Sequence, residues 1–528
     1  MSVLLQEASL CFAVSGGVMS AEKKFVMSID SGSTGIRAML FNRAGEIVER
    51  AYQRTDPVTP EPGALEHDPE MLWQSLRSVV SEVLSKQNAA AVGAIGVTNQ
   101  RGSFCLWEKA TGKPVTNFIS WADVRSADVA TAMNQNFTWR VLRLLGRLLA
   151  GLSKMMLATS MLKFRTDHAT VRLKWALDRD PALRKRCEAG EIQFGTLDTF
   201  FIYRLTAGRS HLTDTGNAAA TGMFNPFQLK WNDILEKLFQ IPLQMMPEVR
   251  DTSGDFGTSE PEFTGGVAIP IRGAAGDQMA ALFGQRCLEP GQVKISQGSG
   301  AFVDMNVGGK PQVSRRGLLP LVAWTHAGKP TYMLEGYVAT AGTLLDWLGR
   351  GIGLSDTPAE LNQLAGSVRN TEGVLFFPTP TGIQFPYQRP DLRATILGLS
   401  LRTQRPHVAR AVLEGIALLL REILDGIKKD TGIAIKSVRV DGGVSRSDIL
   451  LQCIADFTGI TVERAPEADM SATGAAYFAG LGSGFWASPA ELPVMPGYEI
   501  FEPKMSESDR ERKVREWRLA LKGLLKTV

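Results

Sequence analysis

The 528-residue chain has few of the residues from which metal centres and disulfide frameworks are built. It contains 5 cysteines and 5 histidines, and no C-x-x-C, H-x-x-H or H-E-x-x-H motif occurs among them. Cysteines that are odd in number and far apart argue against a disulfide framework and against a zinc site. The same usage favours a reducing compartment, so we expect a cytoplasmic protein.

Long apolar runs and a strong net charge are also absent. No uninterrupted apolar run reaches the roughly 18 residues of a membrane-spanning helix. Residues 1–22 are mildly apolar, but they lack a basic start and Glu7 interrupts them, so we expect a leader, which could be disordered, rather than a signal peptide. The 58 basic and 54 acidic residues give a net charge of +4, which is too small to indicate a nucleic-acid partner.

Two segments share the order strand, glycine loop, strand. In the first, a strand-like run at 25–30 breaks at 31–35 and resumes at 36–41. In the second, the run 292–297 leads into Gly298-Ser299-Gly300 and a further strand-like run. We also expect a weaker third copy over 93–113. The recurrence indicates a duplicated fold with two similar halves, although hairpins are common enough to recur by chance.

Helical patterns lie between these hairpins. Apolar residues recur at helical spacing over 69–86 and over 408–428. Strands mixed with helices in both halves predict α/β domains, and 44 % hydrophobic residues suffice for a sizeable core. The Pro- and Gly-rich segment 259–273 is the best inter-domain crossing. We therefore expect an N-terminal domain over residues 23–268 and a C-terminal domain over 269–528.

The glycine loops have the composition of phosphate-binding turns. Glycines let backbone N–H groups approach an anion, and the hydroxyls of Ser31, Ser33 and Thr34 add donors. Asp30, at the end of the first strand, suits a hydrated Mg²⁺ ion. A third loop, Asp441-Gly442-Gly443, follows another strand. Three such loops on two facing domains would clamp a nucleotide, and neither a P-loop nor a Rossmann G-x-G-x-x-G is present.

Asp277, in the glycine-rich stretch GAAGDQ, is the best candidate for a general base. Phosphoryl transfer needs positioning, charge neutralisation and a carboxylate that accepts a hydroxyl proton. The alternative is a purely structural Asp that caps a helix over 279–283. The histidines are scattered and G-x-S-x-G is absent, so a Ser-His-Asp hydrolase has no support.

The segment from Val129 to Thr166 contains no acidic residue. Arg140, Arg143 and Arg147 lie in it beside leucines at helical spacing. A basic amphipathic helix suits weak contact with an anionic membrane surface through 139–165, or contact with a partner. We favour the alternative, in which the helix covers the domain core and its basic face is solvated.

Taken together, these motifs resemble the FGGY carbohydrate kinases, and within them the glycerol kinases, along almost all of residues 23–522. The ISWADVR block and the basic segment resemble a divergent branch. The blocks that carry the resemblance include FVMSIDSGSTGIRAMLFNRAGEIV, IGVTNQRGSFCLWEKATGKPV, AGDQMAALFGQ, QGSGAF and VRVDGGVSRSDILLQ. It implies an α/β fold of two actin-like (ribonuclease H-like) ATPase domains facing a central cleft. The implied activity is transfer of the ATP γ-phosphate, with Mg²⁺, to a hydroxyl of glycerol or a related small polyol.

The resemblance also implies roles for individual positions. Asp277 would be the catalytic base, and Asp30 and Asp277 would hold the magnesium ion. The polyol pocket would be lined by Arg101, Trp121, Gln278 and Phe302. The nucleotide would contact Ser33, Thr34, Arg37, Gly298, Ser299, Gly342, Gly443 and Ser447.

Two departures from the family bear on the acceptor. The family's Arg-Glu pair is Arg101-Gly102 here, and its pocket tyrosine aligns with Asp167 or with nothing. An unpaired buried hydroxyl costs about 1–3 kcal/mol, so a polyol needs replacements. We expect Asp123 to supply the missing carboxylate. A pentulose or other sugar kinase, and an ATP-binding non-catalytic regulatory or membrane-associated protein, stay open as alternatives, as does a homo-oligomer.

Overall fold

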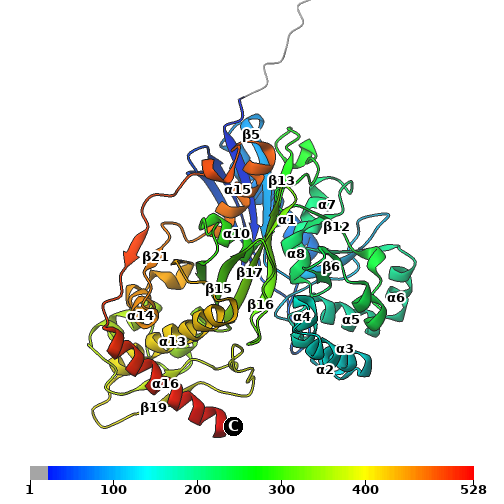
Figure 1. Cartoon of the computed structure of the whole chain (residues 1–528). Coiled ribbons are helices and arrows are strands. Elements are labelled where there is room, and N and C mark those ends of the chain that lie inside the picture. Colours follow the sequence, from blue (N-terminus) through cyan, green and yellow to red (C-terminus); the bar gives the residue numbers. More distant parts are fainter. Residues whose placement is uncertain (1–21, 528) are drawn as a thin grey trace, which may run out of the picture.

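Two sheets organise the molecule, one in each half of the chain (Figure 1). The computed structural model describes residues 22–527, so the expected leader lies outside the described residues except for Glu22. The first sheet has the order β13-β5-β1-β2-β3 and the second has the order β16-β17-β15-β14-β20-β21-β22. The first comprises β13 (Ile271–Gly276), β5 (Val92–Asn99), β1 (Phe25–Ser31), β2 (Gly35–Asn42) and β3 (Ile47–Arg54). The second comprises β16 (Leu319–His326), β17 (Lys329–Val338), β15 (Ala301–Gly308), β14 (Gln292–Gln297), β20 (Ser437–Asp441), β21 (Val462–Arg464) and β22 (Glu499–Phe501).

The two sheets repeat one pairing pattern. In the first, β1 pairs antiparallel with β2 and parallel with β5. In the second, β14 pairs antiparallel with β15 and parallel with β20. In both sheets the glycine loop joins the two antiparallel strands. The predicted duplication is therefore confirmed at the level of strand pairing.

The expected third copy is wrong. β5 lies in the first sheet, whereas β6 (Phe104–Glu108) belongs to a separate four-stranded sheet of order β4-β7-β6-β8. The turn at Gly102, with φ +73°, sends the chain away from β5. Both faces of β6 are apolar and buried, so it needs layers on each side that a hairpin with β5 would not supply. The other strands of that sheet are β4 (Glu66–His67), β7 (Phe118–Ile119) and β8 (Ile192–Thr196).

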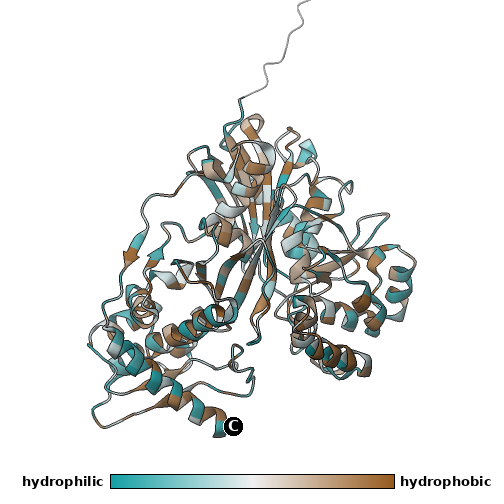
Figure 2. Cartoon of the chain, in the orientation of Figure 1, coloured by the Kyte–Doolittle hydropathy of each residue, from teal (hydrophilic) through white to brown (hydrophobic). Residues whose placement is uncertain are grey.

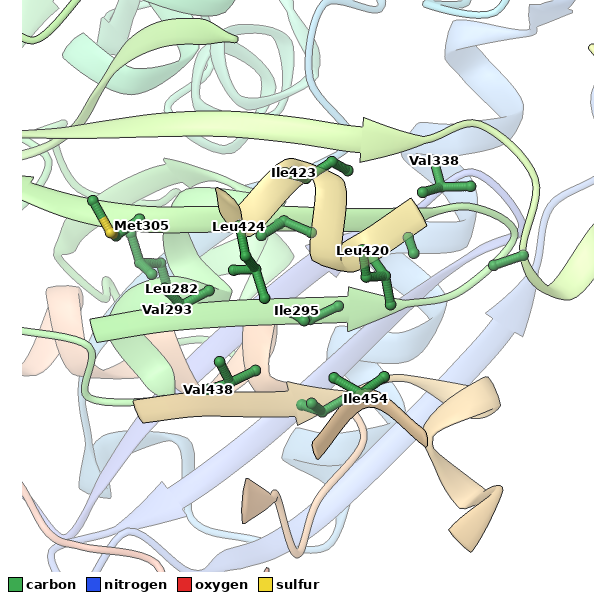
Figure 3. Close-up of a cluster of buried hydrophobic side chains, with 14 of the residues drawn as sticks. Leu282, Val293, Ile295, Met305, Val338, Leu420, Ile423, Leu424, Val438 and Ile454 are labelled. Atoms are coloured by element: carbon green, nitrogen blue, oxygen red, sulfur yellow. The ribbon is translucent and has the colours of Figure 1, made fainter. Parts of the chain in front are cut away.

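The expected helices are confirmed, with small differences at their ends. α1 (Pro69–Ser85) begins after Asp68, whose carboxylate caps the backbone N–H groups of Glu70 and Met71. α13 (Arg405–Thr431) ends at Gly432, whose φ of +69° terminates the helix. Leu420, Ile423 and Leu424 of α13 lie over β14 and β15 in a buried cluster of the second sheet (Figure 3).

The halves are not separated at residue 268. β13 follows the expected crossing, yet it pairs parallel with β5 and completes the first sheet. α15 (Met470–Ser483), from the other end of the chain, packs on β1, β5 and β13 (Figure 1). It crosses α10 (Asp277–Gly284) so closely that a β-carbon on Gly474 would lie 1.8 Å from the Ala280 carbonyl oxygen. The two halves therefore share a common base beneath the cleft.

The remaining elements cover the sheets and form a helical lobe at the right of Figure 1. The lobe contains α2 (Ala127–Gln135), α3 (Phe137–Leu148), α4 (Lys154–Met161), α5 (Ala169–Arg179) and α6 (Pro181–Glu188). The other helices are α7 (Leu197–Leu205), α8 (Thr215–Ala220), α9 (Asp233–Phe239), α11 (Gly342–Arg350), α12 (Pro358–Gly366), α14 (Asp448–Thr458) and α16 (Glu507–Thr527). The short strands are β9 (Leu212–Asp214), β10 (Phe224–Asn225), β11 (Lys230–Trp231), β12 (Glu248–Arg250), β18 (Leu375–Phe377) and β19 (Thr395–Leu397).

Four of the five cysteines lie within the described residues. Within residues 22–527, the cysteines Cys105, Cys187, Cys287 and Cys453 are buried and free, and none forms a disulfide. No helix in the described part of the chain combines the length and apolarity needed to cross a bilayer.

Candidate active site

A cavity of about 1080 Å³ is lined by residues of both halves. Many of the residues expected at the site line it: Ser33, Arg101, Trp121, Asp277, Gln278, Gly298, Ser299 and Phe302. The predicted central cleft is therefore present, and it brings the first and second glycine loops together with the candidate base.

Asp277 is the first residue of α10 and directly follows β13. Its Oδ1 accepts a hydrogen bond of 2.8 Å from the Gln278 backbone N–H and lies 3.4 Å from Nε of Arg101. In the described residues no hydrogen bond is made to Oδ2, and 28 % of the side chain is exposed to the cavity. One oxygen is thus held in place while the other is available to accept a proton.

Asp30, at the end of β1, is almost completely buried beside this cavity. Ser471, which lines the cavity, donates a hydrogen bond of 2.7 Å to its Oδ2, and Nε of Arg37 lies 3.8 Å from the same oxygen. Burial raises the pKa of Asp30 and the charge of Asp277 raises it further, while Arg37 and Ser471 act in the opposite direction. The Arg37 guanidinium is itself paired with Asp469.

The two carboxylates suit a hard divalent cation. Asp30 and Asp277 are close enough to interact electrostatically, and both offer only oxygen ligands. No group of three or more His, Cys, Asp or Glu side chains among residues 22–527 is placed to hold a metal ion. Magnesium ions in proteins are commonly held by one or two carboxylates together with phosphate oxygens and water.

The glycine loops place donors at the same cavity. Ser33 and Thr34 are exposed in the loop between β1 and β2, and Ser33 lines the cavity. The loop at Gly298 and Ser299 packs on the start of α11, where the Gly342 N–H donates to the Gly298 carbonyl at 3.0 Å. A β-carbon on Gly342 would lie 2.7 Å from that carbonyl oxygen, so this position needs glycine to hold the loop.

The third loop follows β20. Asp441 and Gly442 line the cavity, and Gly442 has φ +88° with its α-carbon against the Gln297 backbone. A β-carbon on Gly443 would meet no atom within 4 Å. Ser447 is buried as the cap of α14, where its Oγ accepts a hydrogen bond of 3.1 Å from the Leu450 N–H. Thr34, Arg37, Gly342, Gly443 and Ser447 lie outside the cavity lining, so their nucleotide contacts stay predictions.

A chain of buried charged groups lies behind the base. Arg101 donates to Oε2 of Glu335, on β17, at 2.6 Å. Lys294 pairs with Asp304 at 2.6 Å, with both side chains fully buried, and also donates to Oε1 of Gln278 at 2.6 Å. Burial, helped by Asp304 and opposed by Arg101, raises the pKa of Glu335 to about 8. The hydrogen bond from Lys294 thereby fixes the side chain of Gln278, the residue that is expected to line the polyol pocket.

Sequence reasoning missed these residues, although the sequence carries a signal for them. Lys294, Asp304 and Glu335 are charged residues at buried positions of β14, β15 and β17. A charge inside a buried strand requires a partner, and three such charges on neighbouring strands provide partners for one another.

A second group of side chains lies at the wall formed by residues 165–168. Nε of Arg165 donates to Oδ1 of Asp167 at 3.0 Å, and its guanidinium lies 5.8 Å from the ring centre of Tyr337. Tyr337 stacks on Phe302 at 5.7 Å. Asp167 is half-buried, and this desolvation would raise its pKa, but Arg165, His168 and Arg172 lower it to about 2. A carboxylate and a phenol thus face the cavity from positions where the family resemblance did not place them.

The structure does not place Asp123 in the cavity lining, contrary to its expected role. The side chain is fully buried, and its Oδ2 accepts from the Leu65 N–H at 3.0 Å and pairs with Arg125 at 2.7 Å. A buried carboxylate needs such partners, and here they leave no oxygen for a ligand. Asp167, rather than Asp123, presents a carboxylate to the cavity.

A cleft between two duplicated α/β domains, with facing glycine loops and paired carboxylates, is the architecture of a two-domain phosphotransferase. The model of the FGGY family of carbohydrate kinases, N-terminal domain, matches residues 25–284, and that of the C-terminal domain matches residues 293–483. The chain belongs to the FGGY family of carbohydrate kinases. The boundary between the two matches lies after β13 and α10, in agreement with the sheet pairing rather than with a crossing at residue 268.

Curated relatives match over nearly the whole chain. The glycerol kinase of Halorhodospira halophila is 37 % identical over 503 residues, covering 95 % of this chain and 96 % of that protein. The glycerol kinase of Carboxydothermus hydrogenoformans is 38 % identical over 504 residues, covering 94 % and 98 %. Among solved structures, Plasmodium falciparum glycerol kinase with ADP superposes with a TM-score of 0.87 at 28 % identity, covering 96 % of this chain and 99 % of that one. A xylulose kinase from Brucella ovis shares the fold, with a TM-score of 0.83 at 22 % identity and coverage of 96 % and 100 %.

Proposed function

We propose that the protein transfers the γ-phosphate of ATP to a hydroxyl of glycerol, giving glycerol 3-phosphate and ADP. The observation that carries this proposal is the position of Asp277, which lines a cavity together with the glycine loops of both domains. Relatives named glycerol kinase match almost the entire chain, which supports glycerol as the acceptor.

Asp277 acts as the general base. The acceptor hydroxyl gives its proton to Oδ2 as its oxygen attacks the γ-phosphorus in line, and the bond from phosphorus to the β–γ bridging oxygen breaks to release ADP. Arg101 holds the carboxylate through Oδ1, so the base cannot rotate away from the attacking oxygen.

The nucleotide lies between the two domains. Ser33 and Thr34 donate to the phosphates from the first domain, and the loop at Gly298 and Ser299 donates from the second. Gly443 and Ser447 lie toward the nucleoside. This arrangement is supported by the ADP named in the Plasmodium falciparum structure, which shares the fold over nearly the full chain.

A magnesium ion fits the same cleft. Asp30 and Asp277 would hold it, and when bound it neutralises charge on the transferring phosphoryl group. Asp30 contributes in a second way, because its contact with Ser471 ties the first glycine loop to α15.

The cavity wall near Gly102 and Asp167 favours a second candidate for the phosphate acceptor, a pentulose or another small polyol. Gly102 carries no side chain, while Asp167, Arg165 and Tyr337 supply charged and phenolic groups at the wall. Trp121 and Phe302 supply the apolar faces on which the carbon skeleton packs. Four free thiols support a reducing compartment, so we keep the cytoplasm as the expected location. A homo-oligomer stays a prediction.

The decisive experiment is an acceptor panel with purified protein, ATP and Mg²⁺. Glycerol, dihydroxyacetone, xylulose and ribulose are compared by ADP release and by detection of the phosphorylated product. We expect glycerol to give the highest kcat/KM, and Asp277→Asn to lower kcat by about 10²–10⁴-fold. Preference for a ketose would select the second candidate. Absence of any phosphorylated product would leave a non-catalytic ATP-binding protein.

A further inference from the structure

Helix α3 presents two unlike faces. Its inner face packs on the helical lobe, where Trp139 is buried and lies 5.1 Å from the ring of Phe164. A β-carbon on Gly146 would lie 2.7 Å from the Met156 carbonyl oxygen, so α3 and α4 cross closely at this point. Arg143 adds a hydrogen bond of 3.2 Å from its Nε to the Ser160 carbonyl. The helix is therefore firmly attached through one side only.

The outer face of α3 exposes large apolar side chains. Phe137 is 79 % exposed, Leu144 is 56 % exposed and Leu148 is 73 % exposed. Their spacing of seven and four residues places them on one side of the helix. Leu152, which is 84 % exposed, extends the group beyond the end of the helix. Single exposed leucines are ordinary, but a contiguous group on one helix marks an interaction surface. Much of the α3–α4 hairpin is brown in Figure 2.

Basic side chains line one edge of this apolar stripe. Arg140 and Arg147 are exposed and lie seven residues apart, directly beside Phe137, Leu144 and Leu148 on the helix. Neither arginine makes an ion pair within the part of the chain that the structure describes, which contains many arginine–carboxylate pairs elsewhere. With no acidic residue from Val129 to Thr166, the surface carries one sign of charge.

We propose that the outer face of α3 docks on a lipid bilayer that contains anionic headgroups. An apolar stripe with unpaired arginines along its edge suits a helix that lies in the interface, with leucine and phenylalanine among the acyl chains and guanidinium groups among the phosphates. The 12 residues of α3 are too few to cross a bilayer, so the helix lies along it. The uniform positive charge favours an anionic lipid surface over a second copy of the same basic face.

Docking through α3 would also determine where the cleft lies relative to the bilayer. Leu145 and Leu149 lie on the side of α3 that lines the cavity, next to the exposed stripe. Binding through Phe137, Leu144 and Leu148 therefore brings the cavity mouth close to the bilayer surface. This inference goes beyond the proposed kinase activity and does not depend on it.

The test is vesicle flotation with the full-length protein. Phosphatidylcholine vesicles are compared with vesicles that also contain phosphatidylserine, at low and at high salt. We expect the protein to float with the anionic vesicles, and to float much less with neutral vesicles or at high salt, because the arginine contribution is screened. Failure to float with anionic vesicles at low salt would overturn the proposal without any variant.

Two variants and two matched controls locate the contact. Arg140→Glu/Arg147→Glu and Phe137→Ser/Leu144→Ser/Leu148→Ser should each weaken vesicle binding at least about tenfold. The controls Lys109→Glu/Lys113→Glu and Leu399→Ser/Leu401→Ser change exposed residues of the same kinds on other loops and should bind like wild type. None of these residues lines the cavity, so kinase activity and circular dichroism of each variant report intact folding.

The outcomes separate the alternatives. Equal binding by wild type and both α3 variants would overturn the proposal. A change of oligomeric state in the α3 variants, measured by light scattering, would instead assign the face to a second copy. If a serine variant fails to fold, Arg140→Lys/Arg147→Lys serves in its place. It keeps the charge and should retain vesicle binding, and loss of binding in it would contradict an electrostatic contact.

Discussion

Arg101 and Glu335 join the two sheets across the cleft, with Nη2 of the arginine 2.6 Å from Oε2 of the glutamate. Arg101 follows the last strand residues of β5 in the first sheet, and Glu335 lies on β17 in the second. The same guanidinium lies 3.4 Å from the candidate base Asp277. Through Arg101, the orientation of this candidate base therefore depends on a residue of the opposite domain.

Glu335 should make stability fall as the pH rises. Its pKa is raised from 4.5 to about 8 by burial, so between these values the folded state keeps a proton that the unfolded state has released. The folded state binds more protons over this window, so the free energy of unfolding decreases from about pH 4.5 to about pH 8. Glu335→Gln removes the titrating group. The free energy of unfolding of this variant, relative to that of wild type, should therefore increase by at least about 1 kcal/mol between pH 5 and pH 8.

Urea unfolding of both proteins at pH 5, pH 6.5 and pH 8 measures this difference. Parallel pH profiles for wild type and Glu335→Gln would show that Glu335 is ionised in the fold, held by Arg101 rather than by a proton.

Substitutions of Asp167 and Asp123 should have different effects, the first on acceptor binding and the second on stability. Asp167 faces the cavity, so Asp167→Asn should raise the KM for the acceptor about tenfold and leave the KM for ATP unchanged, as expected for one charged hydrogen bond. Asp123 is fully buried against Arg125, so Asp123→Asn should lower the free energy of unfolding by about 3 kcal/mol and leave the acceptor KM unchanged.

Steady-state kinetics and urea unfolding on the same two variants test this pair. The reverse result, with Asp123→Asn affecting acceptor binding and Asp167→Asn affecting only stability, would restore the expected role of Asp123.

Much of the fold could be predicted from sequence because its signals are local. The glycine loops, the helices at 69–86 and 408–428, and the position of Asp277 after a glycine-rich strand all follow from short patterns. The third hairpin could not be excluded, because the turn at Gly102 depends on its positive φ and on packing of β6 in another sheet. The boundary at residue 268 failed for a similar reason, since β13 returns to β5 from far along the chain.

The site residues were predicted best where a strand end or a turn fixes their position. Asp30, Asp277 and the glycine loops lie at or beside the cleft, because strand ends and turns place them there. Asp123 was assigned incorrectly because the pattern SWADVR does not show that Arg125 takes its carboxylate. Tyr337 and Glu335 were missed because only the register of β15 with β17 brings them to Phe302 and Asp304.

Gly474 should be essential to the base of the cleft. A β-carbon there would lie 1.8 Å from the Ala280 carbonyl, and backbone cannot yield as a flexible side chain can. Gly474→Ala should push α15 away from α10 and lower the free energy of unfolding by about 1–3 kcal/mol. Because α15 carries Ser471, the hydrogen bond to Asp30 should weaken and the KM for Mg²⁺-ATP should rise.

Gly523→Ala provides the control for this change. Gly523 lies in α16, and a β-carbon there would meet no atom within 4 Å. Gly523→Ala should therefore be neutral or stabilising by up to about 1 kcal/mol. Thermal unfolding of both variants decides the matter, and equal melting temperatures would mean that α10 and α15 have room to separate.

Gly102 offers the most direct test of the acceptor. Its φ of +73° disfavours any β-carbon, so Gly102→Glu must be compared with Gly102→Ala, which carries the same backbone strain of about 1 kcal/mol. The new β-carbon would have ordinary contacts, 3.5 Å from Nη2 of Arg172 and from the Asp167 carbonyl, so the side chain has a path into the cavity.

If glycerol is the acceptor, the added carboxylate should accept a hydrogen bond from one of its hydroxyls. The KM for glycerol should then be about tenfold lower in Gly102→Glu than in Gly102→Ala. An unchanged KM would mean that Asp167 already supplies the carboxylate, and the double variant Gly102→Glu/Asp167→Asn would show it by recovering the KM lost in Asp167→Asn. A KM that rises for glycerol in Gly102→Glu, relative to Gly102→Ala, would mean that the cavity is shaped for a different acceptor, because an unneeded charge there would only repel Asp167.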